Sequence, residues 1–201
     1  MEQFLATLAE RIPAPGGGAT AAVHAAQAAA LLGMVGRYST GPRYAEHADV
    51  VEKVLVATDA ARTAALGLAD EDARAFTPVG AAYALPASTE AERAHRSDAI
   101  ASGLVLAAGP PSAVIGLAGE LMSWAGVLLP VANRSVITDV AAASEAARAA
   151  ATTARLNVEV NLRGITDTTH RAHLVEVVAT VDDLCVEAER IDRQVRLEIA
   201  T

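Results

Sequence analysis

The sequence contains very few aromatic residues and only one cysteine. Phe, Tyr and Trp together make up 3% of its 201 residues. No run alternates β-branched or aromatic residues with polar ones between turn residues, which argues against strands. The single cysteine, Cys185, excludes an internal disulfide and favours a reducing compartment. The opening Met-Glu-Gln-Phe-Leu lacks the basic start and apolar run of a secretory signal. We therefore expect an all-α, cytoplasmic protein.

Positive charge is scarce as well. Lys53 is the only lysine, and the formal net charge is −8. Nucleic acid binding requires a concentrated basic face, because the partner presents a row of phosphates. We expect no nucleic-acid partner.

Alanine, by contrast, is abundant, and it favours helix. Two tracts have almost no charge: residues 19–36 have none with His24 neutral, and residues 103–132 have only Glu120. A membrane span needs about twenty strongly apolar residues, and alanine adds little to that total. Pro110-Pro111 should also break the second tract. We interpret both tracts as buried helices of a core or subunit interface, and expect a homodimer without a membrane partner.

Turn residues divide the chain into a series of predicted helices. Thr89-Glu90-Ala91-Glu92 fits a capping box, with Thr89 as N-cap. No linker is long enough to separate domains, so residues 1–201 are predicted to form one up-and-down helical bundle without a sheet. The predicted helices are 2–11, 19–37, a tract from 44 towards 83 with a kink near 70–72, 89–108, 112–129, 138–163, and a last one capped by Thr166 or Asp167.

Gly16-Gly17-Gly18 is the most distinctive local motif. Three glycines permit positive φ and close approach of a ligand to the backbone. The uncharged helix that follows offers free amides to an anionic or carbonyl group. An ordinary turn between helices is the alternative. A turn would need only one glycine, so we favour a ligand-facing loop.

Several polar residues are candidates for chemistry. Asp72, in Asp70-Glu71-Asp72, could be a general acid or base if it lies near the interior, although a solvated face is the plainer interpretation. Asp139 could serve the same chemistry or simply begin a helix. Asn157 and Asn161 lie four residues apart and so share one helix face. Asparagine disfavours helix interiors, so a polar pocket is one explanation for this pair.

The five histidines do not form a metal motif. Glu92 and His95 match one Glu-x-x-His element of di-iron bundles, but the required second copy is missing. His170 and His173 lack evident further ligands. We expect no metal site.

Taken in order, these motifs resemble the cyclodeaminase family, which comprises the C-terminal domain of formiminotransferase-cyclodeaminase and free-standing methenyltetrahydrofolate cyclohydrolases. The resemblance runs over nearly the whole chain. It rests on Pro13 to Gly18, Met34-Val35-Gly36, Asp72 with Ala75-Phe76, Leu85-Pro86, Thr89, Glu92, Arg96, Asn133, Thr138-Asp139, Asn157-Val158, Asn161-Leu162 and Ile165-Thr166-Asp167.

The resemblance implies a helical homodimer with a folate cleft near the subunit interface and no cofactor other than the folate substrate. It implies one of two reactions. A cyclodeaminase closes 5-formiminotetrahydrofolate with loss of ammonia, and a cyclohydrolase opens 5,10-methenyltetrahydrofolate with water. The chain holds no formiminotransferase segment, which favours the cyclohydrolase. On this basis Asp72 and Asp139 are the expected acid–base residues. The expected substrate-binding residues are Gly16, Gly17, Gly18, Arg43, Arg96, Asn133, Asn157 and Asn161.

Four positions depart from the family pattern. Ala19 replaces the usual serine, Pro42 stands where basic residues are common, Ala87 replaces the usual lysine, and Ala132 stands where glycine commonly precedes the asparagine. These losses favour an alternative in which the chain binds folate without turning it over. A purely structural helical dimer is a further alternative, which the two intrahelical asparagines disfavour.

Overall fold

The computed structural model describes residues 1–200 and shows a helical bundle in which these residues form no strand. Its α-helices are α1 (Glu2–Leu8), α2 (Gly17–Tyr38), α3 (Ala48–Ala75), α4 (Thr77–Tyr83), α5 (Glu90–Leu128), α6 (Ile137–Leu162) and α7 (Thr168–Ile199). Short 3₁₀ segments cover Pro42–His47, Leu129–Val131 and Arg134–Val136. The predicted all-α, up-and-down bundle is confirmed.

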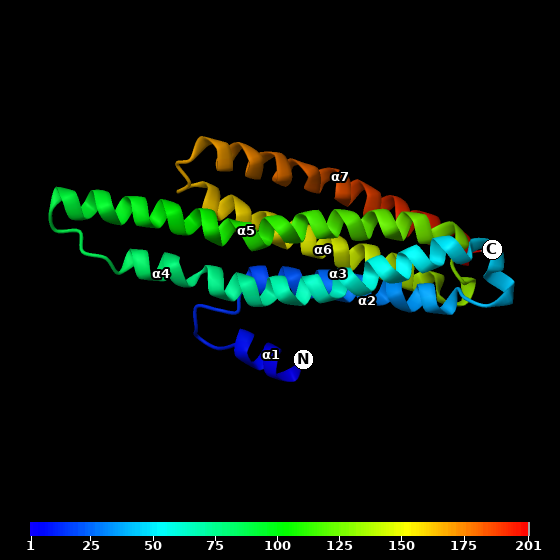
Figure 1. Ribbon diagram of the computed structural model, residues 1–201. Helices are drawn as coiled ribbons and strands as arrows, with labels where there is room; N and C mark the ends of the chain where they lie inside the picture. The colour runs from blue at the N-terminus through cyan, green and yellow to red at the C-terminus, as the bar shows by residue number, and fades with distance from the viewer. Residues whose placement is uncertain (201) are drawn as a thin grey trace.

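More than half of the residues of helix α2 are buried. It packs mainly against α3 and α6 and also touches α5, while α7 covers α5 and α6. Figure 1 shows α5 running the length of the bundle and α1 projecting from the body below α2. Small side chains allow this close packing: alanines dominate the buried positions of α2 and α6.

Two predicted boundaries are confirmed by their caps. The Thr89 hydroxyl accepts a hydrogen bond from the Glu92 amide at 3.2 Å, and the Glu92 carboxylate accepts one from the Thr89 amide at 2.9 Å. This reciprocal pair is the capping box that opens α5. Asp167, one of the two predicted caps, accepts a hydrogen bond from the His170 amide at 2.9 Å and begins α7.

Two other predictions are wrong. Pro110 and Pro111 do not divide the chain into two helices, because α5 continues through them. Each proline removes one backbone donor, but α5 packs against α3, α6 and α7, and burial against these helices can offset that loss. The predicted kink near 70–72 lies instead at Phe76, where α3 ends and α4 begins.

Candidate active site

A narrow pocket of about 160 Å³ lies at the N-terminus of α2. It forms where this helix end meets the last turns of α3 and α6. Its wall combines backbone, one carboxylate, two amides and apolar side chains. The lining residues are Pro13, Ala14, Gly16, Gly17, Gly18, Asp72, Phe76, Ala107, Asn157, Val160 and Asn161. Six of the ten predicted site residues therefore meet in one place.

Asp72 caps α2 from a neighbouring helix. Its Oδ2 accepts a hydrogen bond from the Ala19 amide at 3.0 Å. Burial raises the pKa of this carboxyl above its ordinary value, and the Ala19 hydrogen bond offsets part of the increase. Asp70 and Glu71 are both exposed, so the acidic run is a solvated face except at Asp72. Asp72 can hold a proton nearer neutrality than an ordinary aspartate, as a general acid or base requires.

The glycines matter because of their size. Gly16 is the N-cap of α2, and the only positive φ among the described residues is at Gly41. The expectation that the Gly16–Gly18 loop uses positive φ is therefore wrong. A Cβ at Gly18 would overlap the Asp72 carboxylate, and one at Gly17 would lie 3.1 Å from Asn157 Nδ2. The motif lets α2 begin directly against these two polar side chains.

Gly17 and Gly18 also leave two amides free at the helix start. Neither amide has a hydrogen-bond acceptor among the described residues. Free amides at a helix N-terminus, with the helix dipole behind them, favour a carbonyl or anionic oxygen. The pocket thus offers hydrogen-bond donors beside the Asp72 carboxylate.

Asn157 and Asn161 complete the polar wall from α6. Asn157 Nδ2 donates to the Thr153 carbonyl at 2.9 Å, which holds the side chain in place. Both residues line the pocket, as their four-residue spacing predicted. A polar pocket therefore accounts for two asparagines within a helix.

Arg43, Asn133 and Asp139 lie at the other end of the bundle. Asp139 is in the first turn of α6, whereas Asn157 is in its last turns. The two residues are eighteen positions apart, which corresponds to about 27 Å at 1.5 Å per residue. The Asn133 side chain donates to the Tyr38 carbonyl at 2.9 Å and accepts from the Ser135 amide at 3.0 Å. Within one protomer these residues do not join the pocket.

Arg96 is also outside the pocket. It lies in the second turn of α5 and donates to the Tyr83 carbonyl at 2.9 Å. The nearest α5 residue of the pocket, Ala107, is about 16 Å further along the helix axis. Arg96 therefore links the start of α5 to the C-terminal residue of α4.

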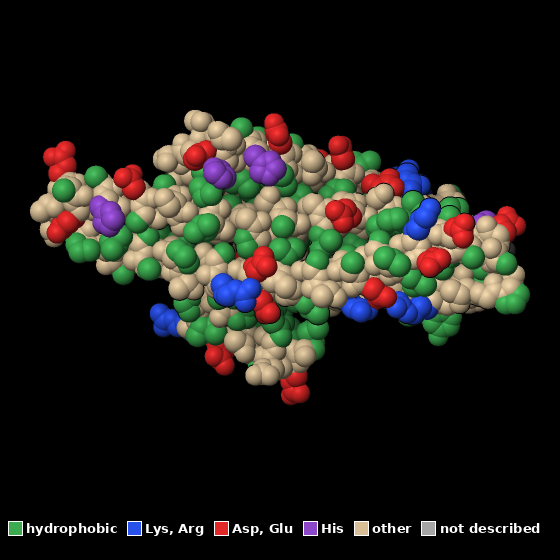
Figure 2. Space-filling view, in the orientation of Figure 1, with side chains coloured by type: hydrophobic (Ala, Val, Ile, Leu, Met, Phe, Trp, Pro, Cys, Tyr) green, Lys and Arg blue, Asp and Glu red, His purple; other side chains and the backbone are tan. Residues whose placement is uncertain are grey.

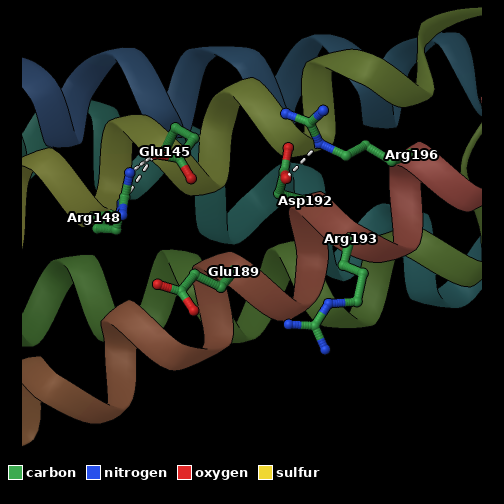
Figure 3. A pocket seen from close by; sticks show the side chains of 6 residues that line it. All are labelled: Glu145, Arg148, Glu189, Asp192, Arg193 and Arg196. Carbon is green, nitrogen blue, oxygen red and sulfur yellow. Dashed lines mark hydrogen bonds and ion pairs between the residues drawn. The ribbon is translucent and has the colours of Figure 1, made fainter.

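A larger hollow of about 540 Å³ lies on the surface between α6 and α7 (Figure 3). It is lined by three arginines and three acidic residues. Arg196 pairs with Asp192 at 2.7 Å, and Arg148 pairs with Glu145. Exposed pairs of this kind contribute little and are typical of a solvated surface. The hollow lacks the buried carboxylate and free amides of the α2 pocket, so we do not assign it a site.

Two further questions from the sequence concern a metal site and membrane-spanning helices. Among residues 1–200, no three His, Cys, Asp or Glu side chains gather as a metal site would require. Helix α2 and residues Glu90–Val131 are long and apolar enough to cross a membrane by length and composition. In α2, 61% of the apolar window is buried, as expected for a core helix, and in the second segment 39% is buried.

Fold and pocket together define an all-helical protein built to bind a small polar molecule beside a half-buried carboxylate. Comparison with known sequences gives the family. The family model described as formiminotransferase-cyclodeaminase matches residues 1–180. The chain belongs to the formiminotransferase-cyclodeaminase family.

Individual relatives agree with this assignment. A methenyltetrahydrofolate cyclohydrolase of Methylorubrum extorquens is 33% identical over 196 residues, which cover 97% of this chain and 93% of that protein. The formimidoyltransferase-cyclodeaminase of Rattus norvegicus is 34% identical over 168 residues, or 83% of this chain and 31% of the relative. The chain thus spans about a third of the length of that longer protein.

A solved structure supports the same fold. The formiminotetrahydrofolate cyclodeaminase of Thermotoga maritima superposes with a TM-score of 0.87 at 27% identity, covering 99% of this chain and 96% of the other.

Sequence reasoning missed the apolar half of the pocket. Ala107 and Val160 were not singled out, and Pro13, Ala14 and Phe76 appeared only as parts of motifs. Apolar lining residues look like any other core or surface residue in a sequence. Val160 is the one apolar lining residue that the sequence could have indicated, because it lies between the two asparagines on α6.

Proposed function

We propose that this protein catalyses proton transfer at the one-carbon bridge of a tetrahydrofolate, as a methenyltetrahydrofolate cyclohydrolase or a formiminotetrahydrofolate cyclodeaminase. The observation behind the proposal is the half-buried Asp72 carboxylate, hydrogen-bonded to the start of α2 and facing a pocket with free amides and asparagines. The names of the family relatives support the substrate class.

The pocket has the groups that the cyclohydrolase reaction needs. The ionised Asp72 would take a proton from water as the water oxygen bonds to the methenyl carbon, giving a tetrahedral carbon between N5 and N10. The protonated Asp72 would then return a proton to N5 as the carbon–N5 bond breaks, and the hydroxyl on the carbon would release its own proton to solvent. This leaves the formyl group on N10 and one proton released overall. The Gly17 and Gly18 amides would bind the oxygen on this carbon, and Asn157 and Asn161 would hold the folate ring.

The cyclodeaminase reaction uses the same tetrahedral centre. N10 attacks the carbon of the protonated formimino group and gives its hydrogen to the Asp72 carboxylate. Asp72 then passes that proton to the amino group, which leaves as ammonia as the carbon–nitrogen bond breaks. One carboxyl with a raised pKa can serve both reactions. A folate substrate is sufficient for either, so no further cofactor is proposed.

The non-catalytic alternative loses most of its support at the pocket. Pro42 and Ala87, the positions without the usual cations, do not line it. Ala19 donates a hydrogen bond to Asp72 from its backbone amide, and this donor is present with any side chain except proline. We therefore favour turnover over binding alone. We also propose that the protein acts as a homodimer in the cytoplasm, with α2 and α5 as buried or interface helices rather than membrane spans.

The direct test is to incubate the purified protein with 5,10-methenyltetrahydrofolate and to follow its near-ultraviolet absorbance. We expect decay faster than the buffer blank. Ammonia release from 5-formiminotetrahydrofolate tests the second reaction in parallel. Folate binding with neither reaction would contradict the enzymatic proposal and restore the non-catalytic alternative.

A further inference from the structure

Helix α5 contains the only pair of adjacent prolines in the sequence, Pro110-Pro111. Proline disfavours a helix interior more strongly than any other residue, yet α5 continues through the pair. Positions that break a local rule inside a continuous element are often functional. The two prolines therefore call for a reason beyond the packing of α5.

The proline pair leaves one carbonyl of α5 without either of its usual donors. A helical carbonyl accepts a hydrogen bond from the amide four residues on, or three residues on where the turn is tighter. For Ala107 these positions are Pro111 and Pro110, and proline has no backbone N–H. Leu106 has a proline at only one of them and retains the Gly109 amide. Ala107 is thus the only residue of the sequence with proline at both positions.

No other group of the described chain replaces the missing donors. Residues 99–119 contain no charged side chain, and Figure 2 shows the middle of α5 without charge on the face in view. Among residues 1–200, no side chain and no amide from outside α5 donates to the Ala107 carbonyl. Ala107 is only 7% exposed, and buried carbonyls are almost always paired. This carbonyl therefore needs a donor that enters from outside the chain.

The Asp72 pocket is where such a donor can reach Ala107. Ala107 lines this pocket and, among the described residues, is the only one that α5 contributes to its wall. Leu106 lines a separate hollow of about 430 Å³ between α5 and α7. The unpaired carbonyl and the α5 wall of the candidate active site thus belong to the same residue.

We propose that the Ala107 carbonyl accepts a hydrogen bond from the 2-amino group of the pterin ring, and that Pro110-Pro111 keeps this acceptor free. The unpaired carbonyl follows from the sequence and the fold alone. The identity of its donor rests on the proposed function.

The polar groups of the pocket suit the amino edge of the ring. The pocket holds about 160 Å³, less than the roughly 300–1,000 Å³ of sites that enclose ligands of drug size, so it takes one end of the substrate. Asn157 uses its Nδ2 on the Thr153 carbonyl at 2.9 Å, which leaves its Oδ1 as an acceptor. An amino group has two N–H donors, and the Ala107 and Asn157 oxygens are two acceptors for them. Asp72 and the free amides of α2 are then left for the one-carbon bridge.

The test restores one helix amide at a time in the full chain. Pro111→Ala gives the Ala107 carbonyl the amide four residues on. Pro110→Ala does the same for the Leu106 carbonyl, at the other hollow, and is the matched control. Tetrahydrofolate is the probe, because it carries the amino edge and has no one-carbon bridge to react. By titration calorimetry we expect its Kd to rise about three- to tenfold in Pro111→Ala, the usual effect of one hydrogen bond, and less than about twofold in Pro110→Ala. In the rate assay, KM for 5,10-methenyltetrahydrofolate should rise by the same factor in Pro111→Ala while kcat is kept, because the amino edge takes no part in the bond changes.

The 2-desamino analogue of tetrahydrofolate separates recognition from packing. It lacks the proposed donor, so wild type and Pro111→Ala should bind it equally, whereas a packing change would weaken both ligands alike. The wild type itself should bind the analogue at least about tenfold more weakly than tetrahydrofolate, because two buried acceptors lose their partner. Circular dichroism checks that both variants keep the helical content of the bundle.

Three results would overturn the proposal: equal Kd values of wild type and Pro111→Ala for tetrahydrofolate, equal weakening by both proline variants, or equal affinity of the wild type for the two ligands. The first would mean that water in the pocket satisfies the Ala107 carbonyl. A wild type that binds tetrahydrofolate but turns over neither one-carbon substrate would refute the proposed function alone.

Discussion

Asp72 differs from its acidic neighbours only by its direction on the helix. Successive residues of a helix point about 100° apart, so Asp70 and Glu71 reach solvent while Asp72 points at the start of α2. The residue types in this acidic run therefore do not indicate which carboxylate loses contact with solvent. The packing of α3 against α2 decides it.

We predict that Asp72→Asn lowers the rate of methenyltetrahydrofolate hydrolysis by about 10²–10⁴-fold, the usual contribution of a general acid or base. The substitution keeps the size of the side chain and an oxygen that can accept from the Ala19 amide. Glu71→Gln removes the same charge from the exposed neighbouring position and should keep the wild-type rate. Absorbance assays of both variants provide the check; equal rates for the two would remove Asp72 from the chemistry.

Stability should show the titration of Asp72 as well. Burial raises its pKa in the folded state, so between the unfolded and folded pKa values the native chain binds more protons than the unfolded chain. The stability contribution of this group is then fully present below the unfolded pKa and is lost as pH rises through the folded pKa. The melting temperature of Asp72→Asn minus that of wild type should therefore become more positive as the pH rises from about 3.5 to 7. A difference that is constant over this range would contradict the raised pKa.

A third prediction concerns the two outer glycines of the motif. Gly18→Ala places a methyl group on the Asp72 carboxylate, whereas nothing lies within 4 Å of a Cβ at Gly16. We expect Gly18→Ala to displace Asp72 and to lower both activity and melting temperature, while Gly16→Ala changes little. Rates and thermal unfolding of the two variants give the comparison. Equal tolerance at both positions would mean that α2 does not need to start in contact with Asp72.

For individual residues, the sequence predicted which polar side chains line the pocket better than it predicted their backbone conformation and contacts. The collinear motifs identified Asp72, Asn157 and Asn161, which meet at the pocket. Positive φ at the glycines was expected from residue type, but the backbone there is constrained by close packing instead. Contacts between distant helices, such as Gly18 with Asp72, have no local signature in a sequence.

Among the elements, helix starts were easier to predict than helix breaks. The caps at Thr89 and Asp167 depend on side chains within three residues of each other, so the local sequence suffices. Continuity of α5 through Pro110-Pro111 depends on tertiary packing, which local propensity does not contain. The same reason explains why the kink expected at 70–72 lies at Phe76.

The prolines of α5 offer a test of this account. Proline in a helix interior costs about 3 kcal/mol relative to alanine, partly offset by about 1 kcal/mol because proline also restricts the unfolded chain. Pro110 is half-buried and Pro111 buried. We predict that Pro110→Ala raises the free energy of unfolding by about 1–2 kcal/mol, measured by guanidinium denaturation. Pro111→Ala should gain less, because it also leaves space in the core; a loss of stability in both variants would show that the prolines are required in α5.

At the scale of the whole molecule, the residues carried by the family motifs form two groups. Asp72, Asn157, Asn161 and the glycines lie at one end of α6, and Asn133 and Asp139 lie at the other. One chain cannot bring the two ends together, since α6 is a continuous helix about 39 Å long. An antiparallel twofold pair can, because it places each end of one copy beside the opposite end of the other.

This arrangement predicts complementation between two inactive variants. We expect Asp72→Asn and Asp139→Asn each to lose at least about a hundredfold in rate if both aspartates act at one centre. When the two variants are co-expressed, random pairing makes about half of the dimers mixed, and each mixed dimer has one site with both aspartates intact, so activity should recover to about a quarter of wild type. The measurement is the methenyltetrahydrofolate rate of the co-purified mixture, with separately purified variants combined just before assay as the control. Recovery absent from the co-expressed sample would confine each site to one chain. A wild-type rate for Asp139→Asn alone would make Asp139, about 27 Å from Asn157 along α6, a helix-start residue with no part in the reaction.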